Sequence, residues 1–361
     1  ICEDMWMPEV AECLGETGAE ILLVPNGSPF EADKLEMRVN LAVERVVETG
    51  LPLVYLNQVG GQDELVFDGG SFVLNDDRRL AVRLPDFTSA VVVTDWRRDG
   101  VRWICQPVAP PPAQPRLEAI YGAMMLGLRD YVNKNRFPGV VLGLSGGIDS
   151  AISAAVAVDA LGADRVRCVM MPSKYTGDES LSDAAECARL LGVQLDTIAI
   201  EPAVQAFGQM LAPSFNGRAP DITEENLQAR IRGNYLMSRS NKFGWLVVTT
   251  GNKSETSVGY STLYGDTAGG FAVLKDVYKT QVYELSRWRN TQVTVIPEHT
   301  ITRAPSAELR PNQTDQDSLP PYDVLDDILK LYVEDDRAIP EIVRSGHDEA
   351  TVRRVARLVD L

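Results

Sequence analysis

The chain has few cysteines, and they are not spaced as metal or disulfide sites require. Its five cysteines, Cys2, Cys13, Cys105, Cys168 and Cys187, are scattered, and no two form a C-x-x-C pair. An odd number of widely separated cysteines disfavours both a disulfide framework and a structural zinc site. The pattern favours a reducing compartment, and we therefore expect a cytoplasmic protein.

Positive charge is also scarce. Lys and Arg number 35 against 51 Asp and Glu, which gives a formal net charge of −16. So acidic a chain repels phosphate backbones, which disfavours nucleic acids and anionic membranes as partners but leaves room for a local pocket that binds a small anion. No apolar run approaches the roughly 20 residues of a membrane-spanning helix, and the opening Ile1-Cys2-Glu3-Asp4 lacks the basic start of a signal peptide.

What remains is the composition of a globular protein of more than one domain. The 361 residues are 45% hydrophobic and 24% charged, and a chain of this length exceeds a single ordinary core. Residues 107–115 read Pro-Val-Ala-Pro-Pro-Pro-Ala-Gln-Pro, a composition that favours extended, semi-rigid chain. We therefore expect a domain over residues 1–106, a linker over 107–115 and a second domain over 116–361.

The part before the linker is expected to mix α and β structure. A largely apolar strand is predicted at residues 19–24 and another at 53–56, with an amphipathic helix at 33–48 between them. Short strands separated by Asp, Gly and Asn turns around 64–73 and 80–84 predict hairpins.

After the linker the pattern changes to strand, loop and helix. Predicted apolar strands are residues 140–144, 166–171, 195–200 and 245–250, and predicted helices are 151–161, 182–191 and 322–336. Ser182 is a possible N-cap, whereas Gly162 and Gly192 are expected to end their helices. This alternation predicts an α/β fold with a doubly wound parallel sheet, whose ligand lies at the carboxyl ends of the strands.

The strongest local signal lies between the first of these strands and its helix, in the run Gly143-Leu144-Ser145-Gly146-Gly147-Ile148-Asp149-Ser150. Adjacent glycines let consecutive backbone N–H groups converge on an anion, and the helix N-terminus adds its positive dipole end. Ser145 and Ser150 add hydroxyl donors. No Lys follows the glycines, so the run is not the loop of P-loop NTPases.

Asp149 needs a partner in this setting, because a carboxylate beside phosphates is repulsive unless a cation such as Mg²⁺ bridges them. An isolated Gly-Gly pair is more often a plain turn, but the flanking strand, helix and serines favour a phosphate loop here. Ser145 to Ser150 resembles the pyrophosphate loop of the ATP-pyrophosphatase superfamily. That resemblance implies adenylation of a carboxyl or carbonyl group with release of pyrophosphate.

Further polar blocks follow the loop in the sequence. Asn226 and Arg230 lie one turn apart on a helix for which Thr223 is a plausible N-cap. Hydroxyl, amide and carboxylate groups then cluster over residues 249–255 and 258–266, and Lys279 lies beyond them. Taken singly, the helix positions indicate solvated surface and a lone Lys is usually exposed. After so polar a loop, Lys279 becomes a candidate to hold phosphate.

Together with the segment 303–309, these blocks resemble NAD synthetase in consistent order from about residue 116 to residue 336. The family uses ATP and Mg²⁺ to ligate ammonia to deamido-NAD (nicotinic acid adenine dinucleotide). The resemblance assigns ATP to Gly143, Leu144, Ser145, Gly146, Gly147, Ile148, Asp149, Ser150, Thr250, Lys279 and Ser306. It assigns deamido-NAD to Asn226, Arg230, Glu255, Tyr260, Ser261, Thr262 and Leu263, and Mg²⁺ to Asp149 and Glu255.

Three other interpretations stay open from the sequence. A GMP or asparagine synthetase type of amidotransferase shares the loop, but the Gly259-Tyr260-Ser261-Thr262 block is not typical of those families. A tRNA-modifying adenylase, a thiolase or lysidine synthetase, would need a basic face or metal-binding cysteines. A non-enzymatic module with a dead nucleotide loop is disfavoured by the intact Asp149, Glu255 and Lys279.

The opening of the chain carries a second resemblance. Ile1 to Trp6 resembles the nucleophile segment of the nitrilase-like amidase domain fused to glutamine-dependent NAD synthetases, a domain with an αββα sandwich fold. Taken alone, Cys2 would be read as an inert buried thiol. The resemblance implies that Cys2 attacks the amide of L-glutamine and liberates ammonia, with Ser28 and Lys34 as glutamine contacts.

The family pattern extends beyond both ends of this sequence. It places a general-base Glu and a Lys before the nucleophile, and a Lys that contacts deamido-NAD after the position of Leu361. We therefore expect the sequence to be a fragment of a longer enzyme, here lacking glutamine hydrolysis if it stands alone. The expected partners are ATP, deamido-NAD and L-glutamine or ammonia, and we expect a homo-oligomer.

Overall fold

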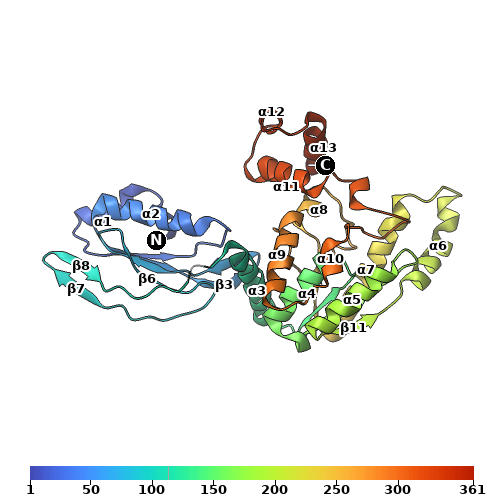
Figure 1. The fold of residues 1–361 in the computed structure, drawn as a ribbon, viewed down its shortest axis with the longest axis horizontal. Coiled ribbons are helices and arrows are strands. Elements are labelled where there is room, and N and C mark those ends of the chain that lie inside the picture. The colour runs from blue at the N-terminus through green and yellow to red at the C-terminus, as the bar shows by residue number, and fades with distance from the viewer. Residues whose placement is uncertain (113) are drawn as a thin grey trace. The chain divides into compact units, whose positions relative to one another are not determined.

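The computed structural model describes residues 1–112 and 114–361, and its elements are labelled in Figure 1. The chain divides into two compact units, Ile1–Tyr131 and Val132–Leu361. The predicted linker includes residue 113, which lies outside the described residues. Helix α3 (Arg116–Lys134) follows that segment, and the boundary between the units falls within it.

The first unit is a mixed α/β structure. Its strands are β1 (Leu22–Asn26), β2 (Leu53–Asn57), β3 (Val59–Gln62), β4 (Leu65–Asp68), β5 (Phe72–Leu74), β6 (Leu80–Arg83), β7 (Trp96–Asp99) and β8 (Arg102–Cys105). Four of them form a sheet in the order β1-β2-β5-β6, in which β1 and β2 are parallel and the other pairs antiparallel. The antiparallel pairs β3–β4 and β5–β6 lie where short strands and turns were predicted, so the predicted hairpins are confirmed, whereas the antiparallel pair β7–β8 was not predicted.

Three helical segments accompany this sheet: η1 (Cys2–Met5), α1 (Pro8–Glu16) and α2 (Lys34–Thr49). Helix α2 matches the predicted helix within one residue, and α1 and α2 lie on the same side of the sheet in Figure 1. Ala42 and Val46 of α2 are fully buried with Leu53 and Phe72 of the sheet, so the apolar stripe read from the sequence forms this core.

Strand β1 corrects the prediction for residues 19–24. It begins at Leu22 and continues through Pro25 to Asn26. The start is later because α1 ends at Glu16 and the chain needs a turn, with Gly18 at φ +92°, before it can extend. A proline is tolerated in this strand because β1 lies at the edge of the described sheet, where one side of the strand needs no N–H donor.

The second unit is built on a five-stranded sheet. Its strands are β9 (Val140–Gly143), β10 (Val166–Met170), β11 (Gln194–Thr197), β12 (Leu246–Thr249) and β13 (Phe271–Ala272), in the order β11-β10-β9-β12-β13. All four neighbouring pairs are parallel, which confirms the predicted parallel sheet. The central strand β9 is the one that leads into the glycine-rich run.

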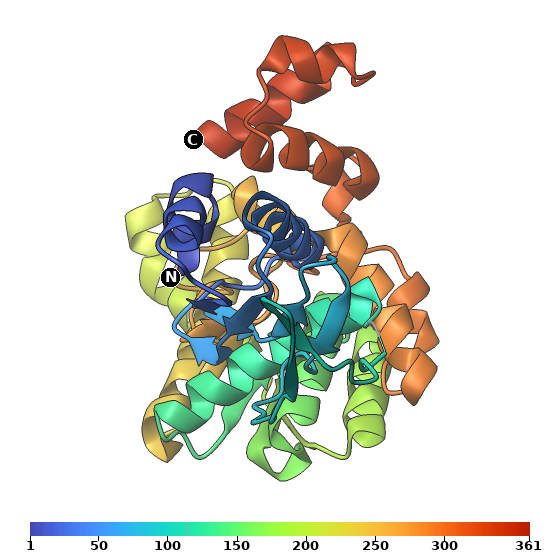
Figure 2. The same cartoon turned by 90° about the vertical axis from the view of Figure 1, so that its left-hand side faces the viewer.

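Helices surround the sheet and extend beyond it. They are α4 (Ile148–Leu161), η2 (Ala163–Arg165), α5 (Asp178–Leu191), α6 (Glu201–Phe215), α7 (Ile222–Phe243), α8 (Lys253–Ser257), α9 (Lys279–Gln292), α10 (Glu298–Thr302), η3 (Asp315–Asp317), α11 (Tyr322–Leu329), η4 (Lys330–Glu334), α12 (Ile339–Arg344) and α13 (Glu349–Asp360). Figure 2 shows α11, α12 and α13 gathered at the C-terminal end of this unit, where they share a core around Leu325 and Ile328.

Several predicted helix ends need correction. Helix α5 begins at Asp178 after Gly177, so Ser182 is not its N-cap, although Gly192 ends it in the left-handed conformation as predicted. Helix α7 is capped by Asp221, not Thr223, because the Asp221 carboxylate accepts the Thr223 N–H. The helix predicted at 322–336 is α-helical only to Leu329 and continues as a π-helical segment, η4.

Candidate active site

A cavity of about 550 Å³ opens in the second unit where β9, β10 and β12 end. Ser145 and Asp149 follow β9, Met171 follows β10, and Thr250 follows β12, and all four line the cavity. The carboxyl ends of parallel strands meet at one edge of a sheet, so side chains far apart in the sequence converge there. The structure therefore places the glycine-rich run at the edge that the sequence indicated.

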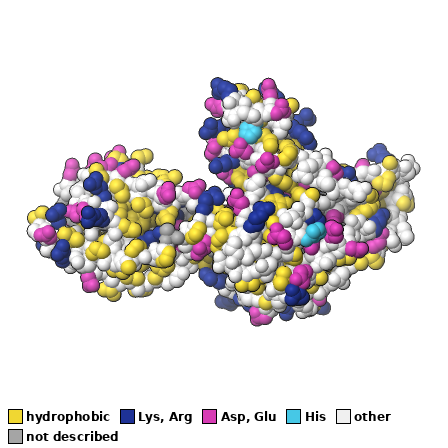
Figure 3. Space-filling model, viewed as in Figure 1, with side chains coloured by type: hydrophobic (Ala, Val, Ile, Leu, Met, Phe, Trp, Pro, Cys, Tyr) yellow, Lys and Arg dark blue, Asp and Glu magenta, His cyan; other side chains and the backbone are white. Residues whose placement is uncertain are grey.

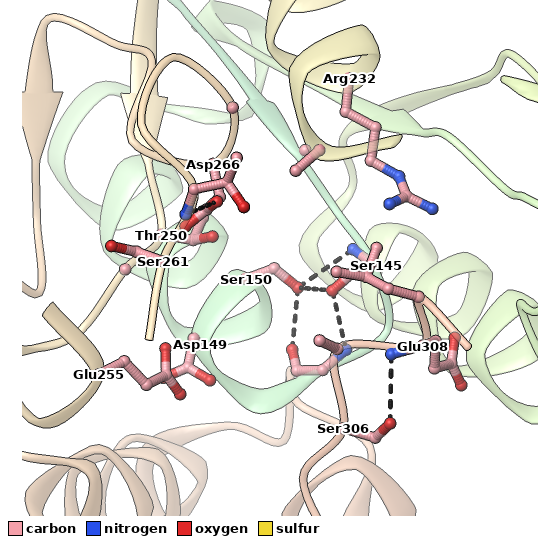
Figure 4. Close-up of a pocket in the computed structure, with 18 of the residues that line it drawn as sticks. Ser145, Asp149, Ser150, Arg232, Thr250, Glu255, Ser261, Asp266, Ser306 and Glu308 are labelled. Atoms are coloured by element: carbon pink, nitrogen blue, oxygen red, sulfur yellow. Dashed lines mark hydrogen bonds between the residues drawn. The ribbon is translucent and has the colours of Figure 1, made fainter. Parts of the chain in front are cut away.

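The glycine-rich run folds as a tight loop into the N-terminus of α4 (Figure 4). The Ser150 hydroxyl donates to the Gly147 carbonyl at 2.9 Å, and the Ser145 hydroxyl oxygen accepts the Gly147 N–H at 3.3 Å. Gly146 has φ +84°, and a Cβ there would lie 2.3 Å from the Ser180 carbonyl oxygen. Only glycine fits this position, and the loop presents N–H and hydroxyl donors beside a helix dipole, as an anion site requires.

Asp149, Glu255 and Lys279 form a buried ionic cluster on one wall of the cavity. The Lys279 Nζ lies 2.5 Å from Asp149 Oδ2 and 2.9 Å from Glu255 Oε1. Lys279 is only 2% exposed, and Figure 4 shows the two carboxylates facing each other. The residue predicted to hold phosphate thus lies, in this structure, between the two residues predicted to hold Mg²⁺.

Burial and charge shift the ionisation of this cluster in opposite directions. Burial raises the pKa of Glu255 to about 7, although Lys279 acts to lower it and Asp149 adds to the rise. Burial acts to lower the pKa of Lys279, but Asp149 and Glu255 outweigh it and raise that pKa above its usual value. The ammonium is therefore firmly charged, and with both carboxylates ionised the cluster carries an excess of one negative charge.

The buried side-chain amide of Asn252 links Asp149 to Glu255. Asn252 caps α8, where its side-chain oxygen accepts the Glu255 N–H at 3.0 Å, and its amide group donates to Asp149 Oδ1 at 2.8 Å. Asn252 is 0% exposed, so this link is fixed within the core. Asn252 was not predicted from the sequence, although its place one turn before Glu255 at a helix start is an N-cap signal.

Two tyrosines lie beside the ionic cluster, Tyr260 within the cavity lining and Tyr322 outside it. The Tyr322 hydroxyl lies 2.8 Å from Asp315 Oδ2 and 3.2 Å from Glu255 Oε1, and its ring centroid lies 5.3 Å from the Lys279 Nζ. The Tyr260 hydroxyl donates to the other oxygen of Asp315 at 3.2 Å. Asp315 and Tyr322 come from a part of the chain where the sequence showed no chemical signal.

The residues that the resemblance assigns to ATP lie together with one exception. Those that line the cavity are Gly143, Leu144, Ser145, Gly147, Ile148, Asp149, Ser150, Thr250, Lys279 and Ser306. Gly146 is not among the lining residues, since it packs against Ser180 behind the loop. Ser306 donates its hydroxyl to the Gln313 carbonyl at 2.6 Å, which turns the segment 303–309 along the cavity rim.

The residues assigned to deamido-NAD divide into two groups. Asn226, Glu255, Tyr260, Ser261 and Thr262 line the cavity, and the Thr262 hydroxyl donates to the Asn226 side-chain oxygen at 2.9 Å.

Arg230 and Leu263 lie outside the lining, where the Arg230 Nε donates to the Leu263 carbonyl at 3.2 Å and the Leu263 side chain is exposed. The structure brings these two residues to each other, not into the cavity.

The cavity also contains two arginines for which the sequence analysis named no role. Arg232 donates its Nε to the Met171 carbonyl at 3.0 Å, and burial lowers its pKa to about 10. Arg303 donates from Nη1 to the Ser180 hydroxyl at 2.8 Å, behind the glycine loop. Both arginines line the cavity together with Lys279, so basic groups are present there in spite of the acidic composition of the chain. The lining also has six carboxyl side chains, those of Asp149, Glu225, Glu255, Asp266, Glu308 and Asp315.

The residues predicted for glutamine hydrolysis lie in the first unit. Cys2 begins η1 with φ +52°, Ser28 is buried after β1, and Lys34 begins α2 with its ammonium paired to Glu31. Burial raises the pKa of Tyr55, with smaller effects from Ser28, which lowers it, and Cys2, which raises it. Cys2 and Ser28 therefore share a neighbour in Tyr55, while the Lys34 side chain is engaged locally.

A buried ion pair that the sequence analysis missed supports Ser28. The Arg38 Nη1 donates to both oxygens of Asp68, at 2.9 and 2.8 Å, and the Arg38 Nε donates to the Ser28 hydroxyl at 3.1 Å. Arg38 also donates to the carbonyls of Ser28 and Pro29. The available signal was the position of Arg38 four residues before the buried Ala42 on the same helix face.

On the face drawn in Figure 3, Lys and Arg side chains are scattered among Asp and Glu. Across residues 1–112 and 114–361, no group of three or more His, Cys, Asp or Glu is placed to hold a metal ion. None of the helices in this described part of the chain is both long and apolar enough to cross a membrane.

Two family models match this chain. Residues 120–361 match NAD synthase, and residues 1–104 match carbon-nitrogen hydrolase. The chain is 54% identical to the glutamine-dependent NAD(+) synthetase of Rhodobacter capsulatus and 51% identical to that of Acinetobacter baylyi. These matches cover 99% and 100% of this chain but 67% and 66% of the two relatives, so the chain spans about two thirds of their length.

Solved structures agree with this pattern. The glutamine-dependent NAD+ synthetase of Acinetobacter baumannii in complex with ADP is 48% identical, with a TM-score of 0.81 over 99% of this chain and 66% of that one. The NH3-dependent NAD synthetase of Campylobacter jejuni is 26% identical, with a TM-score of 0.55 over 69% of this chain and 94% of its own. With both domain models and full-length identity in agreement, the chain belongs to the glutamine-dependent NAD(+) synthetase family.

Proposed function

We propose that this chain forms NAD from deamido-NAD, using ATP to activate the nicotinate carboxylate and ammonia to form the amide. One observation carries the proposal: the anion-binding loop, the Asp149–Glu255–Lys279 cluster and the Asn226–Thr262 wall all face one cavity. A ligase of this type must bring a triphosphate, a cation site and an acid substrate to one point. The family membership of the chain supports the same reaction.

The first step activates a poor electrophile. A carboxylate oxygen of deamido-NAD attacks the α-phosphorus of ATP, the bond to pyrophosphate breaks, and an acyl-adenylate forms. The N–H and hydroxyl donors of Ser145 and Gly147 would bind phosphate oxygens at the N-terminus of α4. Lys279 would stabilise the negative charge that develops on the departing pyrophosphate, while Asn226 and Thr262 hold the acid substrate.

In the second step ammonia attacks the activated carbonyl carbon. The carbon–oxygen bond to AMP breaks, the nitrogen loses a proton, and the amide of NAD and free AMP remain. Glu255, whose pKa is raised to about 7 by burial, is the ionisable group of the cluster that exchanges a proton near neutral pH.

Two carboxylates suit Mg²⁺, which prefers oxygen ligands and often takes one or two carboxylates together with substrate phosphates. Asp149 Oδ2 and Glu255 Oε1 already contact one shared cation, the Lys279 ammonium, so the donor set fits a bound cation. Mg²⁺ would supply charge neutralisation for the phosphates. Asp149 and Glu255 are the residues we propose to hold it.

We further propose that the ammonia comes from L-glutamine. The Cys2 sulfur attacks the side-chain amide carbon, the carbon–nitrogen bond breaks, and the leaving nitrogen takes up the proton given up by the thiol and departs as ammonia. Water later hydrolyses the thioester to glutamate and restores the thiol. The left-handed backbone at Cys2 and the shared neighbour Tyr55 support a built site around this thiol. Ser28 is the proposed glutamine contact, held by Arg38.

The domain arrangement is part of the same proposal. We propose an amidase domain over residues 1–106, a linker over 107–115 and a ligase domain over 116–361, supported by the two matching family models. A homo-oligomer is supported by apolar side chains exposed on α6, among them Phe207 and Met210.

The deciding experiment measures pyrophosphate release from ATP with ammonium as the nitrogen donor, with and without deamido-NAD. We expect release only when deamido-NAD is present, with NAD formed in equal amount. Release that ignores deamido-NAD but responds to xanthylate, aspartate or tRNA would contradict the proposal. Replacing ammonium with L-glutamine, in an enzyme that carries the complete amidase domain and in its Cys2→Ala variant, then tests the nitrogen source separately.

A further inference from the structure

The Asp149–Glu255–Lys279 cluster has a feature that the proposed reaction does not use. The position between two carboxylates, where a bound metal would be expected, is filled by an ammonium from the same chain, at 2.5 and 2.9 Å. In the described part of the chain, Lys279 is among the largest fully buried side chains. A lysine buried this deeply normally needs compensating charge, and here it has two carboxylates.

The contacts of the Lys279 ammonium stabilise it between the two carboxylates. Both carboxylates bind the same nitrogen, and the Tyr322 ring faces it with the centroid 5.3 Å away. Removal of the ammonium would leave two like charges close together in a buried site, where their repulsion is weakly screened. The lysine therefore acts as the counter-ion of the site.

Lys279 is anchored through its backbone, not through its side chain alone. It is the first residue of α9, and its N–H donates to the Ser254 hydroxyl at 2.8 Å. Ser254 in turn donates to Asp326 at 2.5 Å. The flexible four-carbon stem can thus swing while the main chain stays in place, and Asp149 lies in the first turn of α4 beside the phosphate loop.

We propose that Lys279 is a specificity-determining residue. Its ammonium prevents free divalent cations from binding to the carboxylates of Asp149 and Glu255, and allows them to bind only together with nucleotide phosphates. A divalent ion arriving alone would have to displace the ammonium, which would then lose its charge partners in a buried site. The negative charge of a bound triphosphate would pair with the Lys279 ammonium, which leaves the two carboxylates able to bind the divalent cation. This inference rests on the proposed use of ATP and Mg²⁺.

The test measures Mn²⁺ binding by electron paramagnetic resonance in the absence of nucleotide. The full chain should bind Mn²⁺ at this site at least about tenfold more weakly than its Lys279→Met variant, which keeps the stem length but removes the charge. The gained binding should disappear in Lys279→Met combined with Asp149→Asn, because that change removes one of the two carboxylate ligands. Equal Mn²⁺ binding by the full chain and a folded Lys279→Met variant would overturn the proposal.

Lys253→Met is the matched control. The Lys253 Nζ also pairs with one carboxylate, Glu334 at 2.5 Å, and lies 4.9 Å from the Tyr278 ring centroid, but Lys253 does not line the cavity. It should leave Mn²⁺ binding unchanged, and a gain equal to that of Lys279→Met would also overturn the proposal. If Lys279→Met does not fold, Lys279→Gln provides the same loss of charge.

The pyrophosphate assay keeps the two proposals distinguishable. A chain that forms NAD from deamido-NAD, yet binds Mn²⁺ equally with and without the Lys279 charge, would retain the proposed function and lose this inference. A chain that lacks the ligase reaction, but whose Lys279→Met variant still gains a Mn²⁺ site, would contradict the proposed function and retain this inference.

Discussion

The two units of this protein bury charge in different ways. In the first unit Arg38 and Asp68 form a one-to-one pair with side chains 3% and 8% exposed, and the remaining donors of Arg38 reach backbone and hydroxyl oxygens. In the second unit one ammonium serves two carboxylates, and the cluster faces a cavity. A balanced pair stabilises a loop, whereas an unbalanced cluster is a site prepared for a ligand.

The largest expected effect comes from breaking the unbalanced cluster. Asp149→Asn keeps the shape of the side chain but removes one of the two charges, and we expect ammonium-driven NAD formation to fall about 10²- to 10³-fold with little change in thermal stability. Asp159→Asn, on the same helix but paired with Arg289 at 2.6 Å outside the cavity, should retain the activity. An Asp149→Asn variant with near-normal turnover would argue against the cluster as the catalytic centre.

Breaking the balanced pair should affect stability and spare the ligase chemistry. Arg38→Met leaves Asp68 buried without its partner, which should cost about 3 to 5 kcal/mol in the free energy of unfolding. Hydrogen exchange should show lost protection in α2 and β2, with ammonium-driven NAD formation kept at a permissive temperature. Arg98→Met removes an exposed pair with Glu20 and should cost less than about 1 kcal/mol. A loss of protection confined to the second unit would contradict this division of roles.

The smallest effect is a pH dependence that comes from Glu255 in the second unit. Because burial raises the pKa of Glu255 to about 7, the folded chain holds a proton there that the unfolded chain releases at lower pH. The stabilising contribution is therefore complete below the unfolded pKa and is lost as the pH rises through about 7. The affinity for Mg²⁺ with ATP should instead rise with pH, since this binding requires the ionised carboxylate of Glu255.

Titration calorimetry between pH 6 and pH 8 measures this effect. Affinity for ATP with Mg²⁺ should rise with pH in the unaltered chain, by at most about tenfold per pH unit, and should be nearly flat in Glu255→Gln. Glu186→Gln serves as the control, because hydrogen bonding by Arg189 lowers the pKa of Glu186 and it stays ionised throughout. An unchanged slope in Glu255→Gln would assign the pH dependence to another group.

Local patterns were enough to predict four of the five strands in the sheet of the second unit and the helices α4, α5 and α7, but not α6, α9, α12 or α13. The apolar run at 140–144 became β9, and the glycine-rich run after it became the loop before α4. Helix starts were predicted less well, because Asp221 and Gly177 precede residues that also resemble caps. Several hydroxyl and carboxyl groups can compete to cap one helix, and packing of the helix decides between them.

The sequence predicted which residues belong to the candidate site better than it predicted which of them contact one another. Asp149, Glu255 and Lys279 were identified from their motifs, but their common contact depends on where α4, α8 and α9 meet. Asn252, Asp315 and Tyr322 were missed because amides, carboxylates and tyrosines are common in loops and at helix starts. Arg230 and Leu263 belong to family motifs yet lie outside the cavity lining.

The sequence alone determined the alternation of strands and helices, the glycine at position 146 and the set of ionisable residues, because periodicity and backbone freedom are properties of short stretches of chain. The tertiary structure alone decided that one ammonium would pair with two carboxylates 106 residues apart in the chain, Asp149 and Glu255. Charge balance depends on distance and burial, which exist only once the sheet has brought its carboxyl edge together.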